Sequence, residues 1–177
     1  MPAPGQTVPT LTLPRVGGGS FDLHGLMGPK GALAIFYRGS FCPICVRQLS
    51  AVVDRMDDFA ALGVQPVAIS CDDADKATEF VEKAGCSAVP VGHSLTAKAA
   101  RDDWGLWISP ARPGTAEPAF FAEPGLFHVN GDGTLQTAWV QTAPFARPTL
   151  DDVLGAIRFQ QEKQYSPRGT YQGDLAG

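Results

Sequence analysis

Two cysteines, in the segment Cys42-Pro43-Ile44-Cys45, lie where a buried strand gives way to a helix. Residues 33–37 (Leu-Ala-Ile-Phe-Tyr) form a continuous apolar run, which is typical of a strand in a sheet covered on both faces. From Val46 onward, apolar residues recur at helical spacing, and Gly63 is a typical C-terminal stop. The order of strand, cysteine pair and helix therefore predicts an α/β domain.

The position of Cys42 at or beside the start of this helix predicts a reactive thiolate. Unpaired backbone N–H groups and the helix dipole favour an anion there, and they can lower a cysteine pKa from ~8.5 into the range ~3.5–7.5. Cys45, one helical turn further on, can close a disulfide with Cys42. The alternative is a pair of buried, inert thiols, but a pair at a helix start favours redox chemistry.

Composition and charge exclude several classes of protein. The 177 residues predict one domain over residues 1–163, followed by a polar C-terminal tail over 164–177. A net charge of -4 argues against partners such as nucleic acid or an anionic membrane, since no basic stripe is present. No apolar run is long enough to span a bilayer. Residues 1–6 resemble no secretory signal, so we expect a cytoplasmic location.

The remaining segments predict alternating strands and helices around the cysteine pair. The turn Gly17-Gly18-Gly19 predicts a hairpin near the N-terminus, and Asn130-Gly131-Asp132-Gly133 predicts a second. The other expected elements are a strand over 64–69, a helix over 74–84, a short helix capped by Ser94 and running to Asp103, an irregular segment over 105–123, and a last helix capped by Thr149 with Asp152.

The other two cysteines, Cys71 and Cys86, are interpreted as structural. Cys71 follows a predicted strand and Cys86 follows a predicted helix end, where small apolar side chains are common. Their spacing does not provide a second close pair, so the four cysteines do not predict a zinc site.

The segment Phe36-Tyr37-Arg38-Gly39-Ser40-Phe41-Cys42-Pro43-Ile44-Cys45 resembles the signature of peroxiredoxin-like proteins in the alkyl hydroperoxide reductase/thiol-specific antioxidant group. The segment Phe145-Ala146-Arg147-Pro148 fits the same group. The resemblance implies a thioredoxin-like fold, with a central mixed sheet, an N-terminal hairpin and flanking helices. It also implies that Cys42 is the cysteine that attacks the substrate and that Cys45 is the resolving cysteine, which forms a disulfide with oxidised Cys42. Pro124 is implied to be a cis-proline that faces the pair.

The chain departs from peroxiredoxins at positions that activate peroxide. Those proteins carry a threonine and a proline where this chain has Gly39 and Ile35, and their later arginine has no counterpart near Pro124. Arg38 or Arg47 could supply the positive charge beside the thiolate. These departures predict that disulfide exchange exceeds direct peroxide reduction.

The predicted function is that of a thiol–disulfide oxidoreductase, or thiol-dependent antioxidant protein, that uses Cys42 and Cys45 with no cofactor. An alternative is a peroxiredoxin-type peroxidase that reduces hydroperoxides. Both imply a thioredoxin- or glutathione-type reductant, and a protein disulfide or a hydroperoxide as substrate. A different class is a copper-binding module, in which His93 or His128 completes the ligand set. A redox-inert scaffold is a further alternative.

Overall fold

The computed structural model describes residues 1–175. The helices and strands are, in order, β1 (Thr12–Pro14), β2 (Ser20–Asp22), α1 (Leu23–Leu26), β3 (Gly31–Phe36), α2 (Pro43–Asp54), α3 (Met56–Ala61), β4 (Val64–Ile69), α4 (Ala74–Ala84), β5 (Val91–Gly92), α5 (Ala97–Asp102), β6 (Ile108–Pro110), β7 (Phe120–Ala122), β8 (Gly125–Asn130), β9 (Leu135–Val140) and α6 (Leu150–Glu162). Within the described residues, every helix is too short or too polar to cross a bilayer.

The central sheet is mixed, as the resemblance implied. β8 pairs antiparallel with both β3 and β9, whereas β5 pairs parallel with β4. β4 runs parallel beside β3, because hydrogen bonds join Lys30 to Gly63 before the strands and Tyr37 to Ile69 at their ends. The predicted N-terminal hairpin is confirmed as the antiparallel pair β1 and β2. This architecture is the thioredoxin-like fold that the cysteine segment implied.

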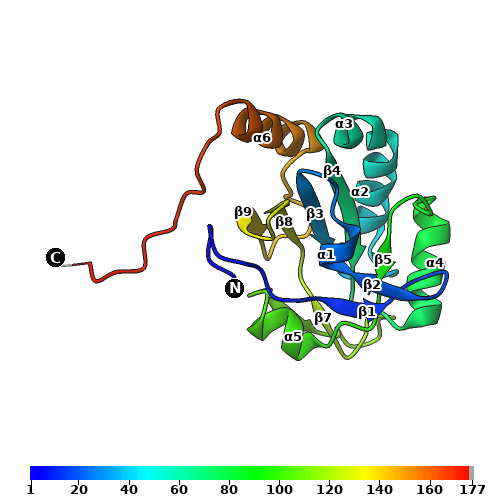
Figure 1. The fold of residues 1–177 in the computed structure, drawn as a ribbon. Helices are drawn as coiled ribbons and strands as arrows, with labels where there is room; N and C mark the ends of the chain where they lie inside the picture. The colour runs from blue at the N-terminus through cyan, green and yellow to red at the C-terminus, as the bar shows by residue number, and fades with distance from the viewer. Residues whose placement is uncertain (176–177) are drawn as a thin grey trace.

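Helices cover both faces of this sheet (Figure 1). Alternate residues of β3 divide between two apolar cores, with Leu33 and Ile35 in one and Ala34 and Phe36 in the other. The first core is closed by α2, α4 and α6. The second is closed by α5 and by the N-terminal hairpin. Burial on both faces is the reason that β3 is apolar throughout. The same packing holds the C-terminal end of β3 in place, and the cysteine segment follows directly from that end.

The long helix expected after the cysteine pair is two helices. α2 ends at Asp54 and α3 begins at Met56, with Arg55 in a non-helical conformation between them (φ -114°, ψ 15°). The Arg55 guanidinium pairs with Asp151 in the first turn of α6 at 2.7 Å. The apolar periodicity that predicted one helix cannot reveal this contact, because Arg55 and Asp151 are far apart in the sequence.

Two further expectations are corrected between β5 and β8. The short helix α5 is capped by Thr96, whose hydroxyl accepts from the Ala99 amide at 3.1 Å. Ser94, the predicted cap, has φ 62° and precedes the helix by a turn. The segment 105–123, expected to be irregular, contains the antiparallel pair β6 and β7. By contrast, the capping box of Thr149 and Asp152 on α6 is confirmed.

Candidate active site

Cys42 is the N-cap residue of α2, directly after the turn that follows β3. Its Sγ accepts a hydrogen bond from the Cys45 amide at 3.3 Å, and Pro43 occupies the first turn, where a missing N–H costs nothing. The side chain that commonly caps a helix at this position is an oxygen acceptor. Here a sulfur takes that place, which favours its anionic form.

The sulfur atoms of Cys42 and Cys45 lie 2.7 Å apart, and both residues are free cysteines. The hydrogen bond from the Cys45 thiol lowers the pKa of Cys42 to about 5, with further contributions from the Cys45 amide and from Arg147 and Arg38. Burial, followed by that same hydrogen bond, raises the pKa of Cys45 well above its ordinary value. The pair therefore carries one negative charge on Cys42, and Cys45 keeps its proton.

Arg147 is the cation in contact with the pair. It comes from the loop between β9 and α6, and its Nη2 lies 3.1 Å from the sulfur of Cys45 and 3.9 Å from that of Cys42. Its Nε donates to the Pro144 carbonyl at 2.8 Å, and its Nη1 donates to Gln48 of α2. Arg147 was not among the residues predicted for the site. The only signal was its place in the segment 145–148, which fitted the resemblance.

Arg38 forms ion pairs with two glutamates, although it was expected to stabilise the Cys42 thiolate. Its Nε forms an ion pair with Glu123 at 3.2 Å, and its Nη2 lies 3.7 Å from Glu117. Its guanidinium also lies 4.9 Å from the ring centre of Phe121 and 5.2 Å from that of Phe41. Arg38 thus links the turn before Cys42 to β7 and acts on the thiolate only through its charge.

The turn before Cys42 is held by a buried carboxylate. Asp72, which follows β4, accepts from the Ser40 amide at 2.9 Å, and burial raises its pKa to about 6. Gly39 has φ 145°, and a Cβ on it would lie 2.6 Å from Asp72 Oδ1 and 2.9 Å from the Phe41 ring. This close approach accounts for glycine at the position where peroxiredoxins carry threonine.

The expectation for Pro124 was wrong in its geometry. The peptide bond between Glu123 and Pro124 is trans. The preceding Glu123 amide donates to the Trp107 carbonyl at 2.7 Å, and the Pro124 carbonyl accepts from Gln141 at 3.2 Å. The segment therefore enters β8 in an extended conformation. A proline favours this conformation in the residue that precedes it, here Glu123.

The histidines do not join the cysteine pair. His93 Nδ1 lies 2.9 Å from the Ser94 hydroxyl, and His128 Nδ1 lies 3.1 Å from Gln160 Oε1. Among residues 1–175, no three His, Cys, Asp or Glu side chains are grouped as metal ligands would be. The copper-binding alternative required His93 or His128 beside the two sulfurs, and neither is grouped with them, so the geometry does not favour it.

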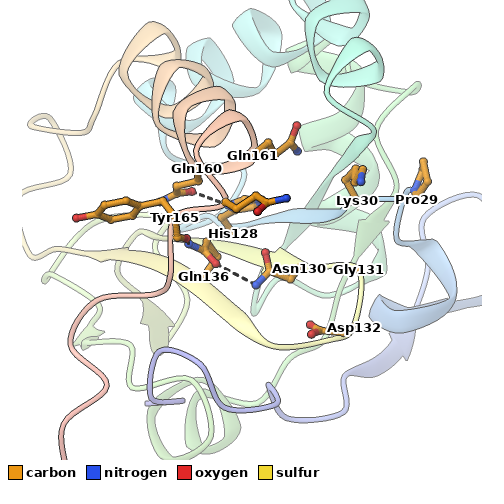
Figure 2. A pocket seen from close by; sticks show the side chains of 11 residues that line it. Pro29, Lys30, His128, Asn130, Gly131, Asp132, Gln136, Gln160, Gln161 and Tyr165 are labelled. Carbon is orange, nitrogen blue, oxygen red and sulfur yellow. Dashed lines mark hydrogen bonds between the residues drawn. The ribbon is translucent and has the colours of Figure 1, made fainter.

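A polar cavity of about 440 Å³ lies away from the cysteine pair, and Figure 2 shows its lining. His128 of β8 pairs with Leu33 of β3. Leu33 lies in the first half of β3, whereas Cys42 follows the end of that strand. Side chains of the lining bind one another: Gln160 accepts from His128, and Asn130 donates to Gln136 at 3.1 Å (Figure 2). Its lining contains no cysteine.

Comparison with known proteins agrees with this architecture. A peroxiredoxin 6 from Arenicola marina, in a crystal structure of a cysteine-to-serine mutant, superposes with a TM-score of 0.77 at 19% identity, covering 92% of this chain and 74% of that one. A peroxidoxin BcpB from Mycobacterium tuberculosis gives a TM-score of 0.72 at 20% identity, covering 90% and 98%. At such identities the likeness establishes the fold.

Sequence comparison adds the family. Peroxiredoxin Bcp of Escherichia coli is 32% identical over 79 residues, which are 45% of this chain and 50% of that protein. A 1-Cys peroxiredoxin PER1 from Hordeum vulgare is 31% identical over 78 residues, 44% of this chain and 35% of that protein. The aligned segments thus span half or less of these two relatives. Residues 4–138 match the AhpC/TSA family, and this range includes the cysteine segment and all of the central sheet except the last two residues of β9. The chain therefore belongs to the AhpC/TSA family.

Proposed function

We propose that this protein is a thiol-dependent peroxidase in which Cys42 reduces a hydroperoxide and Cys45 resolves the product. The observation that carries the proposal is the pair itself: a buried sulfur whose pKa is lowered to about 5, with a second thiol at 2.7 Å. Membership of the AhpC/TSA family and likeness to peroxiredoxins support the same reaction.

In the first step the Cys42 thiolate attacks one oxygen of the hydroperoxide. A sulfur–oxygen bond forms, the oxygen–oxygen bond breaks, and the departing alkoxide or hydroxide takes a proton from water. Cys42 is oxidised to a sulfenic acid and the hydroperoxide is reduced to an alcohol or to water. Arg147, whose Nη2 is 3.9 Å from the Cys42 sulfur, places positive charge beside the reacting atoms.

In the second step Cys45 condenses with the sulfenic acid to give a disulfide and water. An external dithiol, or two thiols of the glutathione type, then reduces that disulfide by exchange and returns both cysteines to the thiol state. Every step uses side chains that lie within hydrogen-bond distance of one another, and none requires a cofactor.

The burial of the attacking sulfur favours a small substrate. Cys42 is only 1% exposed, so a protein disulfide cannot reach its sulfur without opening the site. A peroxide is far smaller. An open cavity of about 630 Å³ lies beside the pair, lined in part by Phe41, Pro43 and Arg47, and it offers an approach to the helix start. These features support a peroxide as the substrate, whereas Gly39 and Ile35 favoured disulfide exchange.

Disulfide exchange is the second candidate, and the separation of the two thiols is the observation that favours it. A dithiol pair on one helical turn can pass electrons to a substrate disulfide by the same attack and resolution. Partial opening of the loop before α6 would be needed to admit such a substrate.

The test is a pair of turnover assays on the same protein. Consumption of hydrogen peroxide and of an organic hydroperoxide would be measured with thioredoxin or glutathione as reductant, beside reduction of a protein disulfide. We expect peroxide turnover that is abolished by Cys42→Ser and limited to one equivalent by Cys45→Ser. Disulfide reduction that exceeds peroxide turnover would show that exchange is the function.

A further inference from the structure

We propose that Arg147 is a catalytic residue of the resolving step, in which it stabilises Cys45 as the thiolate that attacks oxidised Cys42. The inference rests on the proposed function and extends it by dividing the two chemical steps between different charged groups. It predicts that loss of Arg147 slows resolution more than it slows the first attack.

The geometry assigns the guanidinium to the second cysteine. Nη2 lies 3.1 Å from the Cys45 sulfur, a hydrogen-bond distance for a charged donor to sulfur, and 0.8 Å further from the Cys42 sulfur at 3.9 Å. Cys45 is fully buried, so water cannot stabilise a negative charge on it. Among the groups that act on Cys45, Arg147 is the one that favours its anionic form.

Oxidation of Cys42 changes the balance of charges on Cys45. In the reduced pair, three influences hold the proton on Cys45: burial, the hydrogen bond to the Cys42 thiolate, and the negative charge of that thiolate. A sulfenic acid on Cys42 is neutral, so the charge repulsion disappears and the hydrogen bond to an anion is lost. Burial still opposes ionisation, but Arg147 is now opposed by burial alone. The pKa of Cys45 therefore falls only after the first step.

This sequence of events orders the reaction. Before oxidation Cys45 is a proton donor that keeps Cys42 anionic, and after oxidation it becomes the nucleophile. Its thiolate attacks the Cys42 sulfur, a sulfur–sulfur bond forms, and the sulfur–oxygen bond breaks. The departing hydroxide takes up a proton equal to the one that Cys45 released, so one water leaves and the pair is a disulfide.

Arg147 is held in place for this role from both sides. Its Nε donates to the Pro144 carbonyl at 2.8 Å within its own loop, and its Nη1 donates to the Gln48 side chain on α2. α2 also carries Cys45, so the guanidinium and the sulfur share one rigid support. A planar, forked cation can make these contacts together, whereas a lysine ammonium cannot.

The test measures the two steps separately in the full chain. Reduced protein is mixed with one equivalent of hydrogen peroxide and quenched at intervals with a dione that traps sulfenic acids. Mass spectrometry then counts sulfenic acid and disulfide. In Arg147→Gln we expect sulfenic acid to accumulate and its conversion to disulfide to slow by about tenfold for each unit that the Cys45 pKa rises. The pH midpoint of conversion should move upward, and Arg147→Lys should restore part of the rate.

A second assay examines resolution without any peroxide. Cys42 is loaded as a mixed disulfide with a small aromatic thiol, and the release of that thiol by Cys45 is followed by absorbance. Arg147→Gln should slow this release as well. If the wild type releases the thiol but consumes no peroxide, the proposed function fails and the role of Arg147 is still decided by this assay.

Two variants serve as controls. Arg158→Gln removes the same charge from an exposed side chain of α6 and should leave both steps unchanged. Gln48→Leu removes one anchor of Arg147 and should slow resolution to a smaller extent, which covers the case in which Arg147→Gln fails to fold. Resolution in Arg147→Gln and Gln48→Leu no slower than in Arg158→Gln would overturn the inference. So would a first step that loses as much as the second.

Discussion

The Cys42 sulfur accepts hydrogen bonds from both the thiol and the amide of Cys45, at 2.7 Å and 3.3 Å. One residue thus supplies two donors to the attacking atom, and its thiol is the largest influence on the Cys42 pKa. The resolving cysteine consequently has a part in the first step, before its own sulfur reacts.

The first prediction follows from this relationship. Cys45→Ala removes the thiol donor but keeps the amide, so the Cys42 pKa should rise from about 5 toward the ordinary cysteine range. The thiolate absorbance of the reduced variant would be followed against pH. Cys45→Ser, which keeps a hydroxyl donor, is the matched control and should give a smaller rise. An unchanged titration in Cys45→Ala would show that the backbone amide and the arginines suffice.

The second prediction concerns Asp72, which is buried at the turn before Cys42. Its pKa in the folded chain is about 6, above the unfolded value of 3.8, so the folded state binds this proton more tightly. The stabilisation from that proton is complete below pH 3.8 and is lost as the pH rises through about 6. Asp72→Asn keeps an acceptor for the Ser40 amide without the charge.

Denaturant unfolding of the Asp72→Asn variant at several pH values checks this. Relative to wild type, the variant should gain stability between about pH 4 and 7, by at most about 3 kcal/mol at ~1.4 kcal/mol per pKa unit. Partial solvent screening will reduce that figure. Asp75→Asn, at an exposed position of α4, should show no such trend. A gain that shrinks with rising pH would contradict the assigned direction.

The third prediction tests why glycine stands at position 39. In Gly39→Ala the added Cβ would lie 2.6 Å from the Asp72 carboxylate in a backbone conformation that only glycine adopts readily. We expect a loss of about 2–4 kcal/mol in unfolding free energy and slower reaction of Cys42. Gly114→Ala is the matched control, because Gly114 also has a positive φ (75°) but has open space where the Cβ would lie. Its loss of stability measures backbone strain without a contact such as that between the Cβ of residue 39 and Asp72. Equal losses in the two variants would mean that the contact with Asp72 costs nothing.

The fourth prediction separates the two arginines near the pair. Arg38→Gln leaves the buried Glu123 without its cation, whereas Glu117 keeps Arg112, so thermal stability should fall, by about 3 kcal/mol at the unfolding midpoint. The Cys42 pKa should rise less than it does in Arg147→Gln, because Arg38 contributes less to it. Titration and thermal unfolding of both variants give the comparison. A larger pKa rise in Arg38→Gln would assign the closer electrostatic role to Arg38.

Much of the fold could be predicted from the sequence because its signals are local. The apolar run 33–37 and the helical spacing after Cys45 place the cysteines between a strand and a helix, and each signal is contained in one short segment. The capping box of Thr149 and the turn at Asn130 are equally short-range. Hydrogen bonds between residues a few positions apart determine such features, so neighbouring residue types suffice to predict them.

The contacts that complete the site were decided by the tertiary structure. Arg147 reaches Cys45 across 102 positions, and Arg38 forms an ion pair with Glu123, which lies between β7 and β8. Arg55 interrupts the helix after the pair where it binds Asp151 of α6. No local pattern encodes which distant loop lies over a strand end, because that depends on how the whole sheet packs against its helices. The sequence by itself determined the reactive pair and its place at a helix start, whereas folding selected the cation beside it.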